Sequence, residues 1–245
     1  FDDEHSDVIS RAQSAGVEKM LLIGCDISSS EQSLALAKSY HLFSTAGIHP
    51  HDAKTATDSL EDQLTLLATQ PQVVAIGECG LDYNRDFSPR NVQRSVLRRQ
   101  LALAEKLNLP VYLHERDASD DMINILTEFN VRGVLHCFTG DENALKSYLA
   151  LGLYIGITGW VCDERRGQAL QALAPSIPLN RLLIETDAPF LIPRTVKPKP
   201  KSRRNEPALL THVCQTLAEL YQIDAKSVAK QTTDNFYAVF GLEAR

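Results

Sequence analysis

The chain has 245 residues and a formal net charge of -6, which is enough length to bury a large core and excludes a strongly basic coat protein for nucleic acid. Its five cysteines are scattered, with no Cys-x-x-Cys pair, so a disulfide framework and a zinc ribbon are excluded and a cytoplasmic protein is expected. No apolar run approaches membrane-spanning length and no signal peptide is evident, so no membrane association is expected.

Apolar runs and helical patterns alternate along the chain. Seven short apolar runs are predicted to be strands, at residues 19–24, 42–47, 73–77, 109–113, 133–135, 153–157 and 181–184. Helices are predicted at residues 7–15, 28–40, 58–69, 89–107, 118–129, 141–150, 163–173, 206–220 and 225–240. This alternation is typical of βαβ units and therefore predicts a parallel sheet.

Two α/β architectures have such a sheet. A doubly wound open sheet usually carries a Gly-rich phosphate turn, and no G-x-G-x-x-G occurs here. A (β/α)₈ TIM barrel needs eight strands and about 250 residues. Because the chain opens on a helix, we expect the first strand of the barrel to lie upstream of Phe1. We predict one barrel domain over residues 1–245, in which the Pro-rich stretch 193–200 is a long loop.

Histidines and carboxylates follow five of the predicted strands: His49, Glu78, His114, His136 and Asp187. In a barrel these strand ends meet at one face, which is where catalytic groups gather. A single such residue is more simply a structural histidine or a solvent-facing carboxylate, but five of them indicate a metal site. Ligands of this kind, without thiolates, suit Mg²⁺, Mn²⁺ or Zn²⁺. Such an ion can lower the pKa of bound water from 15.7 to about 7, which is useful for hydrolysis.

Seven motifs, in order along nearly the whole chain, carry a family resemblance. They are G-I-H-P-H (47–51), I-G-E-C-G-L-D (76–82), L-H-E-R-D-A (113–118), V-L-H-C-F-T-G (134–140), Y-I-G-I-T-G-W (154–160), E-T-D-A-P-F-L (185–191) and R-R-N-E-P (203–207). Together they resemble the TatD family of metal-dependent deoxyribonucleases. The resemblance implies a TIM barrel of the amidohydrolase type. It also implies that Glu78, His114, His136 and Asp187 are metal ligands, that Glu78 bridges two ions when two bind, and that Asp187 activates the water.

One feature of many family members is missing. They carry His-x-His at the end of the first strand for a second ion, whereas His5 precedes a helix and does not form that motif. We therefore expect either one or two divalent ions. Mg²⁺ is the expected metal, and Mn²⁺ and Zn²⁺ are the alternatives.

A basic cluster without acidic residues predicts phosphate binding: Arg194, Lys197, Lys199, Lys201, Arg203 and Arg204. The alternative is a solvated basic loop. Asn205 follows this cluster in the R-R-N-E-P motif and is predicted to contact substrate. Arg116, two residues after His114, could bind a phosphate with two hydrogen bonds. A further helical stripe, Arg90, Arg94 and Arg98, is interpreted as a solvated face.

The remaining predicted contacts are histidines and aromatic rings. His49 and His51 are expected at the scissile phosphate, with His49 counted among the catalytic residues. Phe138 and Trp160 follow predicted strands and could stack on a base, although core packing is the alternative for Phe138.

These predictions describe a metal-dependent exonuclease that removes nucleotides from DNA ends, with single strands preferred. The resemblance alone implies the 3′ to 5′ direction, and RNA is a further candidate substrate. A monomer with a role in DNA repair or degradation is expected. An amidohydrolase that acts on an amide, lactone or amine is a second hypothesis, against which the basic cluster argues. A scaffold barrel is a third, and the set of ligand residues argues against it.

Overall fold

The structure is a computed structural model that describes residues 1, 4–198, 202 and 204–243. Contacts divide the chain into two units, which are described separately. The histidine unit comprises Lys19–His136, Glu142–Tyr154 and Tyr237–Arg245. The Trp160 unit comprises Phe1–Glu18, Cys137–Asp141 and Ile155–Phe236.

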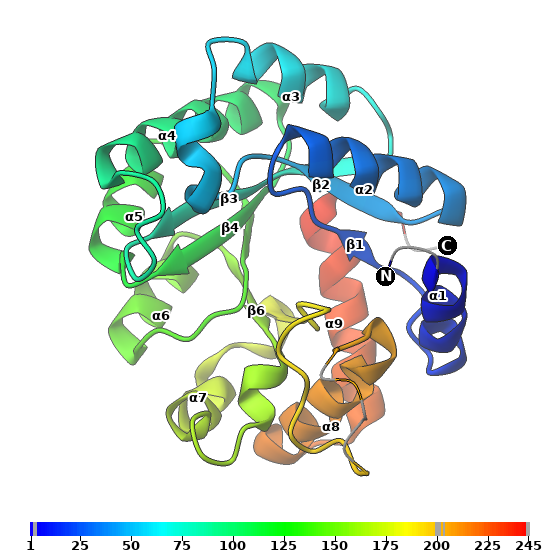
Figure 1. Ribbon diagram of the computed structural model, residues 1–245. Coiled ribbons are helices and arrows are strands. Elements are labelled where there is room, and N and C mark those ends of the chain that lie inside the picture. Colours follow the sequence, from blue (N-terminus) through cyan, green and yellow to red (C-terminus); the bar gives the residue numbers. More distant parts are fainter. Residues whose placement is uncertain (2–3, 199–201, 203, 244–245) are drawn as a thin grey trace. The chain divides into compact units, whose positions relative to one another are not determined.

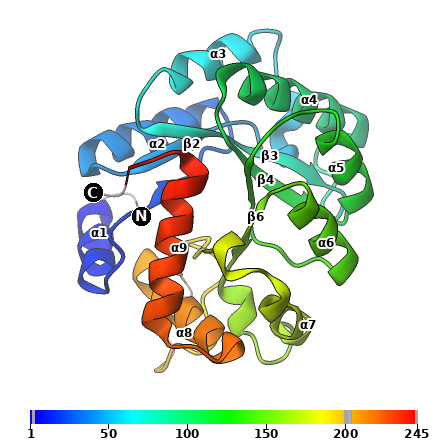
Figure 2. The ribbon, with the colours of Figure 1, turned by 180° about the vertical axis from the view of Figure 1, so that it is seen from behind.

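The histidine unit contains five parallel strands that pair in chain order. They are β1 (Leu21–Leu22), β2 (Phe43–Ala46), β3 (Val73–Asp82), β4 (Val111–Arg116) and β5 (Gly133–Leu135). The connecting elements are α2 (Ile27–Tyr40), the 3₁₀ helix η2 (Pro50–Thr55), α3 (Leu60–Ala68), α4 (Arg90–Leu107), α5 (Ser119–Leu126) and α6 (Glu142–Ala150). Figures 1 and 2 show α2, α3, α4 and α5 along the outer side of β2, β3 and β4. The strands are thus covered by helices, as their continuous apolar runs require.

Local sequence explains the helices of this unit. The side chain of Asp26 accepts a hydrogen bond from the backbone nitrogen of Ser29, and the Ser29 hydroxyl accepts one in return, so a capping box starts α2. The apolar stripe of α4 includes Val96, Leu97 and Leu101, all of which are buried. This helix therefore packs the face that its periodicity predicts.

The Trp160 unit contains β6 (Tyr154–Ile157), whose first residue belongs to the histidine unit, and β7 (Leu182–Ile184). The two strands are parallel, with Ile155 opposite Leu182. Its helices are α1 (His5–Ser14), α7 (Gln168–Leu173), α8 (Leu210–Tyr221) and most of α9 (Ala225–Phe240), with 3₁₀ helices η3 (Gly159–Cys162), η4 (Ala174–Ser176), η5 (Leu179–Arg181) and η6 (Pro207–Leu209). Among the helices that the structure describes, none has the length and apolar character needed to cross a bilayer.

The seven predicted strands are all present, but two of them continue further than the apolar runs suggested. β3 runs through Glu78 to Asp82, and β4 runs through His114. The two strands pair with each other as far as Asp82 and Arg116. A β-bulge lies within this pairing: Gly77 lies opposite Tyr112 and Cys79 opposite Leu113, so Glu78 is an extra residue. The prediction that Glu78 stands where its strand ends was therefore wrong.

The helix predicted for residues 163–173 begins only at Gln168. Before it, the Asp163 carboxylate accepts hydrogen bonds from the backbone nitrogens of Arg165 and Arg166. This side chain therefore holds a turn in place of the expected first helical turn, a competition typical of Asp.

Candidate metal and nucleic-acid site

Three histidine rings surround the carboxylate of Glu78. Its Oε1 atom lies 3.1 Å from Nδ1 of His114, 3.4 Å from Nε2 of His49 and 3.8 Å from Nε2 of His136. On the other side, the thiol of Cys25 donates to Oε2 over 3.6 Å. The bulge at Glu78 allows this arrangement, because an extra residue re-aims a side chain relative to the regular strand.

The Glu78 carboxyl is 8 % exposed, and its charge is maintained by these neighbours. Burial raises its pKa, but hydrogen bonds with His114 and His49 lower it more, so the pKa lies well below its usual range. An ionised, buried carboxylate beside imidazole nitrogens is a donor set that fits a divalent cation.

A second buried carboxylate, Asp82, was missed by the sequence reasoning. Its Oδ2 atom lies 2.7 Å from Nε2 of His51 and 3.3 Å from Nε2 of His114, and the residue is 1 % exposed. Burial raises the pKa of Asp82, but hydrogen bonds, the largest from His114, lower it below its usual range. Burial lowers the pKa of His114, but its hydrogen bonds with Asp82 and Glu78 raise it more, so the pKa lies above its usual value. Asp82 is the last residue of the I-G-E-C-G-L-D motif, and this place in a motif is the sequence feature that could have identified it.

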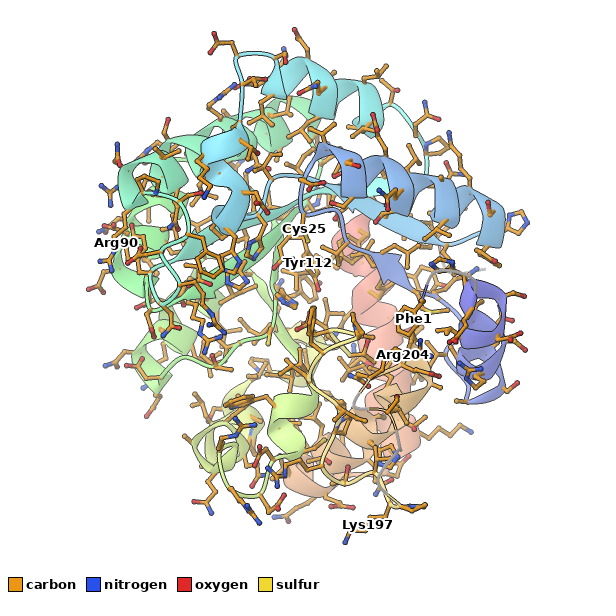
Figure 3. All side chains as sticks on the ribbon, in the orientation of Figure 1. Phe1, Cys25, Arg90, Tyr112, Lys197 and Arg204 are labelled. Atoms are coloured by element: carbon orange, nitrogen blue, oxygen red, sulfur yellow. The ribbon has the colours of Figure 1, made fainter. Side chains whose placement is uncertain are left out.

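His114 and His136, two of the predicted ligands, each have a hydrogen-bond partner on the ring nitrogen that faces away from Glu78. The Tyr112 hydroxyl lies 3.1 Å from Nδ1 of His136, and Asp82 contacts Nε2 of His114. The nitrogens facing Glu78 are then Nε2 of His136 and Nδ1 of His114. Metal-binding histidines characteristically have such partners, which fix the ring orientation. Figure 3 labels Tyr112 and Cys25 among the side chains of this unit.

The ring of His49 lies with Glu78 and His114 in one group of candidate metal ligands, but its hydrogen bonds differ from theirs. Its Nδ1 atom accepts a hydrogen bond from the backbone nitrogen of His51, 3.1 Å away. Burial lowers the pKa of His49, which favours the neutral ring, and the proton of that ring then lies on Nε2. His49 therefore presents a hydrogen-bond donor and not a free lone pair.

In the Trp160 unit, Asp187 follows β7 and begins a tight turn. The backbone nitrogen of Phe190 donates to the carbonyl oxygen of Asp187 over 2.8 Å. Asn205 holds this turn, because its side-chain nitrogen donates to the carbonyl oxygens of Thr186 and Phe190 over 2.8 and 2.7 Å. The Asn205 oxygen accepts from the nitrogen of Glu206, and the residue is fully buried. Its amide is thus occupied in supporting the segment that carries Asp187.

The other predicted contacts differ in exposure. Phe138 is only 3 % exposed, so it packs in the interior and offers no ring face to a base. Trp160 lines an open pocket, and Arg116 is exposed at the end of β4. Arg204 forms ion pairs with two carboxylates, and its guanidinium carbon lies 4.8 Å from the centre of the Phe1 ring. Figure 3 labels both residues. Arg203 lies outside the described residues, as do Lys199 and Lys201.

The arginine stripe of α4 is engaged with neighbouring carboxylates. Arg90 pairs with Asp86 at 2.7 Å, and Arg98 pairs with Glu128 at 2.6 Å. Arg94 pairs with an aspartate at 3.1 Å. These contacts fit the interpretation of a solvated face.

Comparison with known proteins identifies the family. Residues 1–241 match the family described as TatD related DNase. The chain belongs to this family. A protein of Enterobacter lignolyticus named 3′-5′ ssDNA/RNA exonuclease TatD is 49 % identical, and the alignment covers 99 % of this chain and 95 % of that protein. A protein of the same name from Salmonella typhimurium is 48 % identical, with 98 % and 94 % covered.

Solved structures of TatD-family proteins agree with this assignment. A TatD homologue from Escherichia coli superposes with a TM-score of 0.89 at 29 % identity, covering 98 % of this chain and 93 % of that chain. A TatD-family hydrolase from Entamoeba histolytica gives a TM-score of 0.86 at 27 % identity, with 96 % and 89 % covered. A dihydroorotase, at 12 % identity and a TM-score of 0.61, shares the fold alone, with 93 % and 65 % covered. The predicted α/β fold class, a TIM barrel, is confirmed.

Proposed function

We propose that this protein is a metal-dependent exonuclease that removes nucleotides from the 3′ ends of single-stranded DNA and RNA. The observation that carries the proposal is the ionised Glu78 carboxylate surrounded by three imidazole rings. The family and the names of the similar proteins support the choice of nucleic acid as substrate. We further propose that residues 1–245 act as one domain, as a monomer, in the cytoplasm, in DNA repair or degradation.

The residues that would hold the ion are Glu78, His114 and His136, with Asp187 proposed as a further ligand on the basis of the family resemblance. We propose Mg²⁺ as the ion, with Mn²⁺ or Zn²⁺ as alternatives and one or two ions bound; the carboxylate donors suit Mg²⁺ and Mn²⁺, and the imidazole donors suit Zn²⁺. A divalent ion held there would supply Lewis-acid activation of water and offset the negative charge of a phosphate. Asp82 and Tyr112 orient the histidine rings through the hydrogen bonds described above.

The remaining residues act on the strand itself. The Nε2 proton of His49 can be donated to a phosphate oxygen, and the His51 ring, held by Asp82, lies beside it with ring centres 4.3 Å apart. Asp187 is proposed to take the proton of the attacking water, and Asn205 keeps its turn in place. Exposed Arg116 and the basic residues from Arg194 to Arg204 are proposed to neutralise flanking phosphates.

The test is a nuclease assay with end-labelled single- and double-stranded oligonucleotides, in DNA and RNA versions, after chelation and after return of each metal. We expect cleavage to stop on chelation, to return with Mg²⁺ or Mn²⁺, and to proceed from the 3′ end of single strands. A 3′-phosphorothioate end should protect the strand. Metal-dependent turnover of amides or lactones with no cleavage of any oligonucleotide would support the amidohydrolase hypothesis instead.

A further inference from the structure

The Trp160 unit contains an open pocket formed by the segments that follow β6 and β7. Its volume is about 780 Å³, and residues on its walls include Trp160, Asp163, Arg166, Phe190, Pro193 and Arg194. Pockets of roughly 300–1,000 Å³ are typical of sites for small organic groups. The pocket is therefore large enough for a nucleobase with its sugar.

One wall combines an indole ring with a planar cation. The guanidinium carbon of Arg166 lies 4.6 Å from the centre of the Trp160 ring. Its Nε atom donates to the carboxylate of Asp163 over 3.0 Å, and Arg194 approaches the same carboxylate at 3.5 Å. Asp163 is itself 3 % exposed, so a buried anion fixes both arginines at the pocket. Guanidinium planes and indole rings are the surfaces on which unpaired bases stack.

A second wall presents an exposed phenylalanine. Phe190 lines the pocket and is 67 % exposed, an unusual state for so large an apolar side chain. Its backbone is nevertheless fixed, because its nitrogen donates to Asp187 and its carbonyl oxygen accepts from Asn205. A ring that stands on a fixed backbone and is open to solvent can stack on a base without the cost of ordering the loop.

The same turn connects the pocket with the proposed catalytic residue Asp187. Pro189, also on the pocket wall, is two residues from Asp187, which limits their Cα separation to roughly 7 Å. A strand whose scissile phosphate lies at Asp187 would thus have an adjacent nucleotide within reach of the pocket.

We propose that this pocket binds one unpaired base next to the scissile phosphate, by stacking on Trp160, Arg166 and Phe190, and that it thereby selects single strands. The inference rests on the proposed nuclease function. A base in a duplex is stacked and paired, so it must be extruded before it can enter such a pocket. Stacking tolerates every base, because each has a π-face, so the pocket selects strandedness and not sequence.

Trp160 is the only tryptophan in the chain, so its fluorescence reports directly on the pocket. The probe is a single-stranded oligonucleotide with phosphorothioate linkages, which resists cleavage, titrated in the presence of Mg²⁺. Anisotropy of a label on the oligonucleotide measures binding, and tryptophan emission measures occupation of the pocket. We expect emission to be quenched as the single strand binds, and to be quenched much less by a blunt duplex.

Phe190→Ala should weaken binding of the single strand by roughly 5- to 150-fold, the range for loss of stacking on one base. Replacing one base of the oligonucleotide by an abasic site at the correct position should weaken binding to the parent protein and have little further effect on Phe190→Ala. Trp160→Phe should bind more tightly than Trp160→Ala. The matched control is Leu66→Ala, since Leu66 is 71 % exposed on α3 and should not affect binding. Thermal melting of every variant excludes loss of folding as the cause.

Binding without any change in tryptophan emission would overturn the inference. So would an abasic scan in which every position affects the parent and Phe190→Ala alike. In either case the nuclease function would stand if the parent still cuts single strands. A parent protein that neither binds nor cuts oligonucleotides under any metal condition would overturn both.

Discussion

Glu78→Gln tests the proposed metal site most directly. Glutamine preserves the size of the side chain and one carbonyl oxygen, but it removes the negative charge that lies within 3.8 Å of three imidazole rings. Because the pKa of Glu78 is held well below its usual range, the parent carries this charge throughout the neutral range. The substitution therefore removes a full negative charge at every pH near neutrality.

The size of the effect follows from the contacts. An interaction of a hydrogen-bonded charged group contributes about 1.5–3 kcal/mol, and a factor of ten in rate or affinity corresponds to about 1.4 kcal/mol. We expect metal affinity to fall by roughly one to two decades and the cleavage rate at fixed metal to fall by at least about two decades. The depressed pKa means that the Glu78 charge also stabilises the metal-free fold at neutral pH, so the variant should lose about 1.5–3 kcal/mol of unfolding free energy and still fold.

The assay compares three measurements on the same preparations. Calorimetric titration gives the metal affinity, a labelled single strand gives the cleavage rate, and thermal melting gives the stability in chelator. Glu142→Gln is the matched control, because Glu142 is an exposed glutamate of α6 in the same unit, paired with Lys146. If Glu78→Gln cuts DNA at nearly the parent rate, Glu78 is not a metal ligand and the proposed mechanism fails. A large loss of stability with activity per folded molecule preserved would assign Glu78 a purely structural role.

Three further predictions concern the candidate metal site, the pocket and the basic cluster. Tyr112→Phe removes the hydroxyl that contacts His136 and should weaken metal affinity by about 10- to 100-fold, measured by metal titration; an unchanged affinity would show that the ring needs no partner. Burial raises the pKa of Asp163, but hydrogen bonds from its neighbours depress it below the unfolded value of 3.8, so its stabilisation is present above that pH and is lost as pH falls through the depressed pKa. Asp163→Asn should therefore lower the free energy of unfolding by about 1.5–3 kcal/mol at neutral pH and leave it unchanged in strong acid. Denaturant unfolding across pH measures this, and a loss of stability that is independent of pH would contradict it. Arg203→Ala should lower the salt dependence of DNA binding by about one unit of slope, whereas Arg204→Ala should change it less, because two carboxylates already hold Arg204; equal slopes for all three proteins would show that neither contacts phosphate.

Much of the fold could be predicted because it depends on neighbours in the chain. The seven strands and most helices follow from apolar periodicity over four to eighteen residues, and α4 buries the stripe that its spacing predicts. Periodicity failed at residues 163–167, where Asp163 bonds to local backbone nitrogens and delays α7. It also failed at Glu78, because a bulge is defined by the partner strand and cannot be recognised within one segment.

The candidate site could be predicted in part, because the order of strands in the sequence shows which residues share one end of a parallel sheet. Parallel strands present the same end to one face, so the recurrence of His and carboxylate residues after predicted strands indicated Glu78, His114 and His136 before any geometry was known. Their partners Tyr112 and Cys25 gave no signal, because Tyr112 lies within an apolar run, Cys25 directly follows one, and each contacts a residue 24 or 53 positions away.

The sequence by itself determined the alternation of strands and helices, the class of the fold, the donor types and, through its motifs, the family. Only the tertiary structure decided that Phe138 is buried, that Asn205 supports the turn after Asp187, and that Asp163 fixes two arginines beside Trp160. The physical reason is that the chemistry of a side chain is written in its residue type, whereas its exposure and hydrogen-bond partners depend on segments that lie far away in the chain and come together only on folding.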